Sequence, residues 1–461
     1  MNQNELLAET ESLCPECLCK IPARKTSDSG NVYLEKDCPQ HGSFKTLIWR
    51  GDAASYQNWS KNSIPAVPSK SYLVDSNRGC PFDCGLCPEH MADTCNAIME
   101  VSHRCNLNCP VCFASSTDNA VYDPDMSAIR GMYQTLLDTG GPYPVQLSGG
   151  EPTIRDDLHL IVAIGKQMGF KHIQINTNGI RIAEDIEYLQ QLKDSGASVI
   201  YLQFDGVSEK TYLYTRGASL LESKIRAVEN CAKIKMGVIL VPVITPGIND
   251  NELGAIVEFA RKRIPIVKGV HFQPVSYFGR YPITPQDKDR ITIPDVLAGL
   301  ETQTSGRIKV NSFIPRRCDD THCAFSSLYI LTEEGKLLAT TNFDHCQSPV
   351  TSFGQMKSTP AEQARKFVNN HWVYKEVNAD ACSCENTHNN LLKRAQKYYL
   401  SITGMPFQDV WNIDLERLKR CCTHVVTPNR QMIPLCAYYL TSRTGKRLYS
   451  QGTSVNTRYT Y

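Results

Sequence analysis

The segment Cys105-Asn-Leu-Asn-Cys109-Pro-Val-Cys112-Phe113 decides how the rest of the chain is interpreted. Its cysteines have the spacing C-x3-C-x2-C, in which one loop can place three thiolates at three corners of a cubane 4Fe–4S cluster. A cluster that only transfers electrons normally has four cysteine ligands. After Cys112 the next cysteine is Cys231, more than a hundred residues later. The segment therefore predicts a 4Fe–4S cluster with one open iron, which can bind a substrate.

A second triplet of the same spacing comes earlier, in Cys80-Pro-Phe-Asp-Cys84-Gly-Leu-Cys87. Cys95 follows it and can supply a fourth thiolate. This arrangement predicts a fully ligated auxiliary 4Fe–4S cluster. The alternative is that both triplets bind zinc.

Two shorter pairs stand near the start of the chain, in Cys14-Pro-Glu-Cys17 and Cys38-Pro-Gln-His41. Their separation suits two knuckles that close on one tetrahedral ion, either zinc or a mononuclear iron of the rubredoxin kind. Either His41 or Cys19 completes the ligand set. The role is expected to be structural, because a ribbon of this size has little core of its own. Free surface thiols are the alternative.

Eight further cysteines lie from Cys318 onward, enough by count for one or two more metal sites. The adjacent Cys421 and Cys422 cannot easily both ligate one compact site, so one is expected to be a bystander. Buried reduced thiols are the alternative, and the lone Cys231 is expected to be such a core residue. The candidate ligands are Cys318, Cys323, Cys346, Cys382, Cys384, Cys422 and Cys436.

The composition excludes several classes of function. The 461 residues predict about three domains at roughly 150 residues each. With 49 Lys and Arg against 47 Asp and Glu, the net charge of +2 gives no electrostatic case for nucleic acid as a partner. No apolar run is long enough for a transmembrane segment, and the opening MNQNELLAETESL does not resemble a signal peptide. We expect a soluble, cytoplasmic protein with 20 cysteines, whose clustered cysteines bind metal rather than form disulfides.

From residue 97 onward, short β-rich runs alternate with amphipathic helical stretches. This alternation predicts right-handed βαβ units, an α/β fold class and a partial (β/α)6 barrel whose chemistry lies at the carboxyl ends of the strands. The predicted domains are an N-terminal ribbon (1–70), an auxiliary cluster segment (71–96), the barrel (97–300) and a cysteine-rich C-terminal domain (301–461). The predicted strands are Ala97–His103, Val145–Leu147, His172–Asn176, Val199–Phe204, Met236–Ile244 and Val270–Pro274.

Several motifs fall just after these strands. Ser148-Gly149-Gly150-Glu151-Pro152 is a turn whose glycines leave backbone groups open to a ligand. Asn178 lies in a similar turn, Asn176-Thr177-Asn178-Gly179, and Asp205 adds a carboxylate. Each motif is weak alone, but their order behind the open-iron triplet is specific.

These residues resemble the radical S-adenosylmethionine (SAM) superfamily, on the cysteine triplet with Phe113, SGGEP at 148–152 and TNG at 177–179. The resemblance implies that the open iron chelates SAM, and that reduction by a donor such as ferredoxin or flavodoxin yields a 5′-deoxyadenosyl radical. It further implies that Gly149, Gly150 and Glu151 hold the methionine moiety and that Asn178 and Asp205 face the ribose. The adenine is expected near Val241–Ile244 and Phe272.

A narrower resemblance covers nearly the whole chain, through CPEC…CPQHG, GCPFDCGLC, the triplet and the late CC-x-H-x4-N-R-x3-P-x-C. Through these motifs the chain resembles the subfamily of pterin-methylating radical SAM methyltransferases and the archaeal tetraether lipid synthase. The resemblance implies carbon–carbon bond formation at an unactivated carbon, foremost C-methylation of a pterin-like small molecule. The alternatives are coupling of lipid chains, sulfur insertion and an iron–sulfur electron-transfer protein.

Overall fold

The computed structural model describes residues 5–61, 73–116, 123–340, 358–375 and 394–449. Three of the predicted ligands, Cys346, Cys382 and Cys384, lie outside these ranges. None of the helices within the described residues combines the length and the apolar character that crossing a bilayer requires.

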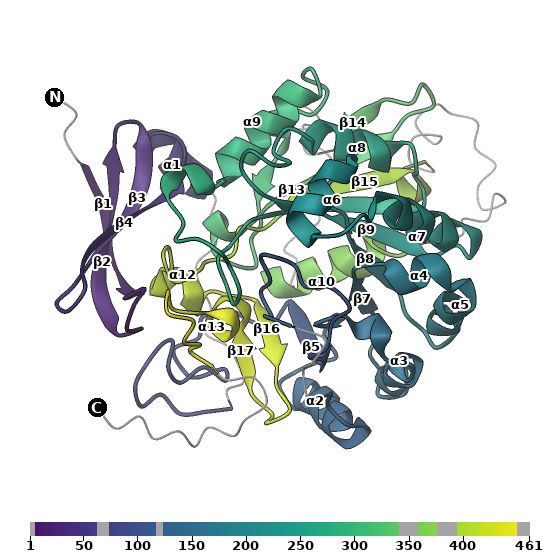
Figure 1. Cartoon of the computed structure of the whole chain (residues 1–461), viewed down its shortest axis with the longest axis horizontal. Coiled ribbons are helices and arrows are strands. Elements are labelled where there is room, and N and C mark those ends of the chain that lie inside the picture. Colours follow the sequence, from purple (N-terminus) through teal and green to yellow (C-terminus); the bar gives the residue numbers. More distant parts are fainter. Residues whose placement is uncertain (1–4, 62–72, 117–122, 341–357, 376–393, 450–461) are drawn as a thin grey trace.

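The N-terminal part is a four-stranded antiparallel sheet at one side of the molecule (Figure 1). Lys36, in its third strand, is fully buried, and its Nζ donates to Leu13 O at 2.8 Å and to Val410 O at 2.7 Å. The ribbon is therefore joined to the C-terminal part of the chain by a buried amine. Its elements are β1 (Glu5–Leu13), β2 (Lys20–Asp28), β3 (Asn31–Cys38) and β4 (Gly42–Trp49), followed by α1 (Ala53–Ser60).

The predicted barrel strands are confirmed, and they pair in parallel in chain order. One predicted run, Met236–Ile244, is divided into two strands at Pro242, which has no backbone N–H to donate. The strands are β5 (Asn96–Ser102), β6 (Val145–Gly149), β7 (Ile173–Thr177), β8 (Val199–Gln203), β9 (Gly237–Val241), β10 (Val243–Ile244) and β11 (Val267–Pro274).

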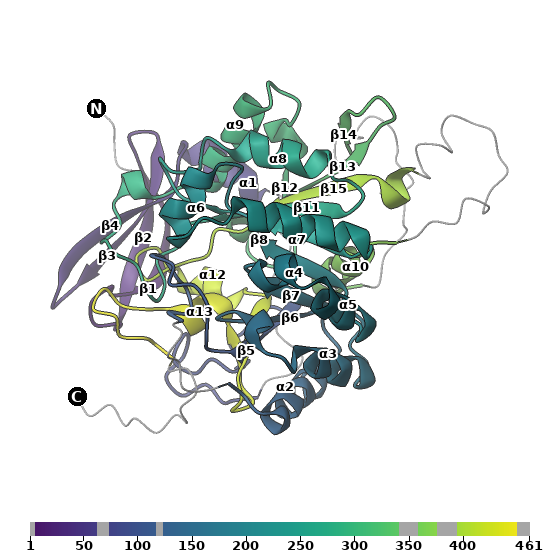
Figure 2. The ribbon, with the colours of Figure 1, turned by 45° about the vertical axis from the view of Figure 1, so that its right-hand side comes forward.

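Helices cover the outer face of this sheet (Figure 2). They begin and end as follows: α2 (Met126–Asp138), α3 (Leu158–Gln167), α4 (Ile180–Glu184), α5 (Ile186–Asp194), α6 (Glu209–Arg216), α7 (Leu221–Lys233), α8 (Leu253–Arg261) and α9 (Ile293–Gln303).

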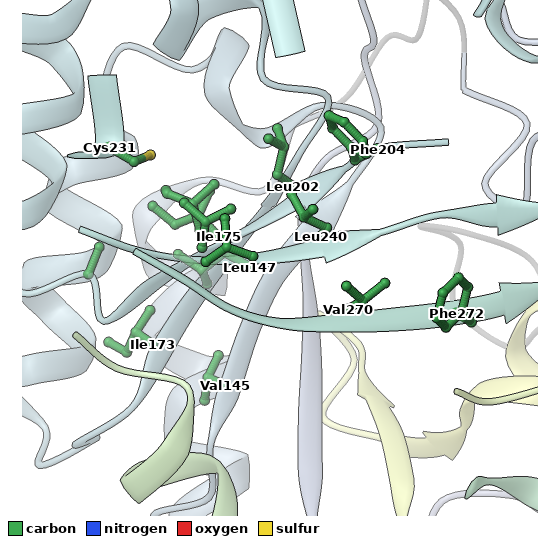
Figure 3. Packing of buried hydrophobic residues seen from close by; sticks show 14 of the residues in the cluster. Val145, Leu147, Ile173, Ile175, Leu202, Phe204, Cys231, Leu240, Val270 and Phe272 are labelled. Atoms are coloured by element: carbon green, nitrogen blue, oxygen red, sulfur yellow. The ribbon is translucent and has the colours of Figure 1, made fainter. Parts of the chain in front are cut away.

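The core lies between the sheet and these helices (Figure 3). Cys231 is fully buried in it, which confirms the prediction that this thiol is a core residue. Phe272 is also part of the core, so it does not line the cavity described below. Its neighbours His271 and Gln273 line that cavity instead, because successive strand residues point to opposite faces.

The C-terminal part extends the barrel sheet at both of its edges. β15 (Tyr399–Gly404) pairs in parallel with β11, and β16 (Thr423–Val426) pairs in parallel with β5. The predicted domain boundary at residue 300 thus divides the sequence, but strands from both sides of it belong to one sheet. The remaining elements are β12 (Ile314–Pro315), β13 (Phe325–Leu331), β14 (Leu337–Ala339), α10 (Pro360–His371), α12 (Leu415–Lys419), β17 (Met432–Pro434) and α13 (Leu435–Tyr439).

Candidate functional site

The open-iron triplet follows β5, at the carboxyl end of the first barrel strand. Arg280, which follows the last parallel strand of the predicted barrel, holds this loop. Its Nε donates to Cys109 O at 3.0 Å, and its backbone exchanges two hydrogen bonds with Cys112, at 2.9 and 3.0 Å. The ends of the first and sixth strands therefore meet around the triplet.

The two glycines of SGGEP are required by a close approach of backbones. Gly149 has φ +125°, and a Cβ there would lie 2.0 Å from Ser102 O; a Cβ on Gly150 would lie 2.1 Å from Arg104 O. Gly150 N donates to Ser102 O at 2.7 Å, and Glu151 N donates to Arg104 O at 2.8 Å. The glycine turn is thus bonded directly to the segment that leads into the triplet, and no side chain fits between them.

Glu151 and Asn178 join the ends of β6 and β7. The Glu151 carboxylate is buried and accepts from Asn178 N at 2.6 Å and from the hydroxyls of Thr153 and Thr177, both at 2.6 Å. Asn178 Nδ2 in turn donates to Asn106 Oδ1, within the triplet loop, at 2.7 Å. Glu151 thus holds the two turns in place around the triplet, and its contact with the methionine moiety stays a prediction.

Asp205 is held by Arg216 at the end of β8, and its contact with a ribose stays a prediction. Its carboxylate is fully buried, and Arg216 donates to both oxygens, at 2.6 and 2.9 Å. Val243 N donates to it as well, at 3.1 Å. Burial favours the neutral form of Asp205, yet the Arg216 guanidinium holds its pKa below the usual value. No motif in the sequence pointed to Arg216, which lies beside Cys109 and lines the cavity.

The donor set at the triplet fits a cationic cluster. Burial, together with the neighbouring Glu151, Cys109 and Cys112, raises the pKa of Cys105 to about 12. The charged form of Cys105 is therefore disfavoured unless a cation lies among these side chains. An iron–sulfur cluster bound by the thiolates supplies that charge.

The ribbon brings its predicted ligands together. The ligand atoms of Cys14, Cys17, Cys38 and His41 all lie within 4.8 Å of one another. His41 Nδ1 is 3.6 Å from the Cys14 sulfur and 3.4 Å from the Cys38 sulfur. Cys19 interacts with Cys17 but is not part of this group. Three sulfurs and one imidazole at these distances fit a single tetrahedral ion.

Cys95 groups with residues far away in sequence. Its thiol and those of Cys318 and Cys422 are buried and lie within 4.8 Å of one another, with 3.4 Å between the last two. Cys95 precedes β5 and Cys422 precedes β16, and these parallel strands start side by side, Asn96 opposite Thr423. The expectation that Cys95 joins the earlier triplet is therefore corrected. The three cysteines form a second group at the amino end of the barrel, named the auxiliary triad below.

The other predicted ligands are placed as follows. Cys80, Cys84 and Cys87 are buried neighbours whose thiols interact. Cys323 Sγ accepts from Arg417 Nε at 3.0 Å, and Cys436 Sγ accepts from Gln408 N at 3.3 Å. Within the described part of the chain, neither of the last two belongs to a group of three close ligand atoms.

A cavity of about 510 Å³ connects the two ends of the barrel. Cys112 and Gly149 line it at the carboxyl end, and Cys95 and Cys318 line it at the amino end. Amide side chains from β6, β7, β8 and β11 also line it, besides Asn96 of β5, and the sequence analysis assigned the glutamines among them no role. The available signal was a polar residue inside strands that are otherwise apolar. These amides are Gln146, Gln174, Asn176, Gln203 and Gln273.

Comparison with known proteins agrees with this geometry. The radical SAM superfamily matches residues 99–260, and the HMPTM N-terminal zinc ribbon domain matches residues 6–50. A 7,8-dihydro-6-hydroxymethylpterin dimethyltransferase of Methanocaldococcus jannaschii is 37% identical, with 93% of each chain covered. A probable GTP 3′,8-cyclase of Methanothermobacter marburgensis is 29% identical, over 36% of this chain and 53% of that protein. The crystal structure of Streptococcus suis SuiB bound to its precursor peptide SuiA has a TM-score of 0.40 at 17% identity, over 47% of this chain and 46% of that one.

The ribbon, the triplet at the end of β5 and the glycine turn thus occur together in one chain. This chain matches the pterin dimethyltransferase over 93% of both sequences. The chain is a radical SAM enzyme with an N-terminal zinc ribbon domain, and it belongs to the same family as the Methanocaldococcus dimethyltransferase.

Proposed function

We propose that this radical SAM enzyme adds one-carbon units to unactivated carbons of a pterin-like heterocycle. The observation that carries the proposal is the 37% identity to the pterin dimethyltransferase over 93% of both chains. Similarity of this extent includes the ribbon and the C-terminal segments as well as the barrel, so it reaches the parts of the chain that surround the cavity.

The residues of the chain would divide the work as follows. Cys105, Cys109 and Cys112 would hold a 4Fe–4S cluster, which together with SAM supplies hydrogen-atom abstraction from an unactivated carbon. The turn at Gly149 offers bare backbone beside that site. Arg280 would hold the triplet loop against the end of the sixth strand, and the cavity would limit the access of water to the reacting carbon.

The cavity also favours a heterocycle over a lipid chain. An isoprenoid chain offers no hydrogen-bond partners, so its binding would leave the amide side chains buried against hydrocarbon, at a cost in free energy. A pterin carries donors and acceptors around a flat ring, which suits amides. The volume of about 510 Å³ is in the range of small-molecule sites.

The complement of metals is part of the same proposal. Besides the SAM cluster, we assign iron–sulfur clusters to the triplet Cys80, Cys84 and Cys87 and to the auxiliary triad, and zinc or mononuclear iron to the ribbon. Three cubanes would hold about twelve irons per chain. A ferredoxin or flavodoxin would supply the electrons.

The test is anaerobic reconstitution followed by incubation with SAM, a reductant and 7,8-dihydro-6-hydroxymethylpterin. Mass spectrometry should detect the pterin with one methylene unit of added mass for each methyl group, together with 5′-deoxyadenosine. Isotope label placed either in the methyl group of SAM or in a methylene-tetrahydropterin would identify the carbon donor. Formation of 5′-deoxyadenosine without any change in the pterin would reject the pterin as substrate and leave the radical SAM assignment standing.

A further inference from the structure

Two layers of paired polar side chains lie inside the barrel, on β6 and β7. In the upper layer Asn176 Nδ2 donates to Ser148 Oγ at 3.0 Å, directly before the glycine turn. In the lower layer Gln174 Nε2 donates to Gln146 Oε1 at 2.7 Å. All four side chains line the cavity. The upper layer therefore adjoins the turn expected to hold SAM, and the lower layer lies deeper, toward the amino ends of the strands.

Glutamines are unusual at the depth of the lower layer. The interior of parallel barrels is ordinarily filled by branched apolar side chains, and here Gln146 is 9% and Gln174 only 1% exposed. They alternate with Val145, Leu147 and Ile173, which belong to the core in Figure 3. Because successive strand residues point to opposite faces, the sheet presents an apolar face to the helices and an amide face to the cavity.

The hydrogen-bonding capacity of these amides is incomplete. Among the described residues, Gln174 Oε1 and Gln203 Nε2 are buried and have no hydrogen-bond partner. Each of these two amides has a polar side chain close by, His172 beside Gln174 and Asp205 beside Gln203. Neither atom is exposed to the cavity, but both side chains line it, so an amide that turns toward a ligand gains a hydrogen bond there; buried groups of this kind ordinarily have partners.

The charges around the cavity narrow the class of ligand. None of the described residues that line the cavity is acidic, and three of them are arginines. Arg216 and Arg316 are paired with Asp205 and Asp319 behind the wall, and the third is Arg317. A cationic ligand is therefore disfavoured. A neutral or anionic ring whose edge both donates and accepts hydrogen bonds matches neutral amides, and Phe113 and Phe407 in the wall give such a ring aromatic surface.

We propose that Gln146 and Gln174, together with Gln273 from β11, are specificity-determining residues that bind the pyrimidine edge of the pterin. This assignment rests on the proposed function. The 2-amino group and N3–H of that edge donate to amide oxygens, and O4 and N1 accept from amide nitrogens. The lower layer would then hold the heterocycle and the upper layer SAM, between the SAM triplet and the auxiliary triad.

The test measures binding without turnover, on anaerobically reconstituted protein. The probes are 6-hydroxymethylpterin and its lumazine analogue, in which oxygen replaces the 2-amino group. We expect the wild type to prefer the pterin, and Gln174→Met to weaken pterin binding by about 10- to 100-fold and to lose most of the preference. Gln273→Met, at a half-buried position, is the second variant. SAM binding should be retained in both, and Gln134→Met on the exposed face of α2 is the matched control.

The preference is a ratio measured within one protein sample, so partial misfolding does not imitate its loss. If the wild type binds and prefers the pterin while Gln174→Met and Gln273→Met keep that preference, the assignment of the amides is overturned and the proposed function stands. If the wild type binds neither probe, the pterin itself is overturned as substrate.

Discussion

The contact between the glycine turn and the triplet loop can be tested by replacing Gly150 with alanine. A Cβ at this position would lie 2.1 Å from Arg104 O, whereas real Cβ atoms stay beyond 3.0 Å. The two backbones must therefore separate by about 0.9 Å. That movement strains the hydrogen bonds from Gly150 N to Ser102 O and from Glu151 N to Arg104 O, each worth about 0.5–1.5 kcal/mol.

The expected result is a loss of SAM cleavage with the clusters in place. A misplacement of about 1 Å near reacting atoms costs roughly 100-fold in rate, so Gly150→Ala should form 5′-deoxyadenosine at about one hundredth of the wild-type rate. The assay is chromatography of the nucleoside, with iron and thermal unfolding measured on the same sample.

Gly169→Ala is the matched control, because Gly169 has φ +94° and nothing lies within 4 Å of an added Cβ. It should lose about 1–2 kcal/mol of stability from backbone strain and keep its SAM cleavage. Wild-type nucleoside formation by a fully iron-loaded Gly150→Ala variant would refute the reasoning that this close contact positions the SAM-binding turn.

Three further predictions concern the metals and one buried amine. Cys95→Ser should lose about four irons per chain and still cleave SAM. Iron analysis and the nucleoside assay on the same sample check this. If SAM cleavage is lost together with that iron, the auxiliary triad is not a separate site. Cys38→Ala should lose the ribbon metal and unfold at lower temperature, and an unchanged metal content would instead favour Cys19 as a ligand. Burial lowers the pKa of Lys36 from 10.5 to about 7. Between these values the unfolded chain binds a proton that the folded chain has released, so the free energy of unfolding should rise with pH across this window, and Lys36→Met should flatten the rise in a calorimetric series.

The sequence alone determined those features whose residues are neighbours along the chain. The triplet of Cys105, Cys109 and Cys112 spans eight residues, and the ribbon pairs and SGGEP are equally local, so their covalent spacing limits the geometry they can adopt. The barrel strands were also predictable, because an alternation of β-rich and helical segments has few compact arrangements.

The tertiary structure decided the features that depend on contacts between distant segments. Cys95 meets Cys422 because β16 pairs with β5, and Cys318 joins them from the segment between β12 and β13. The amide face inside the barrel likewise exists only once β6, β7, β8 and β11 come together in one sheet. Local spacing cannot reveal such contacts, because they form through sheet pairing and packing across more than a hundred residues.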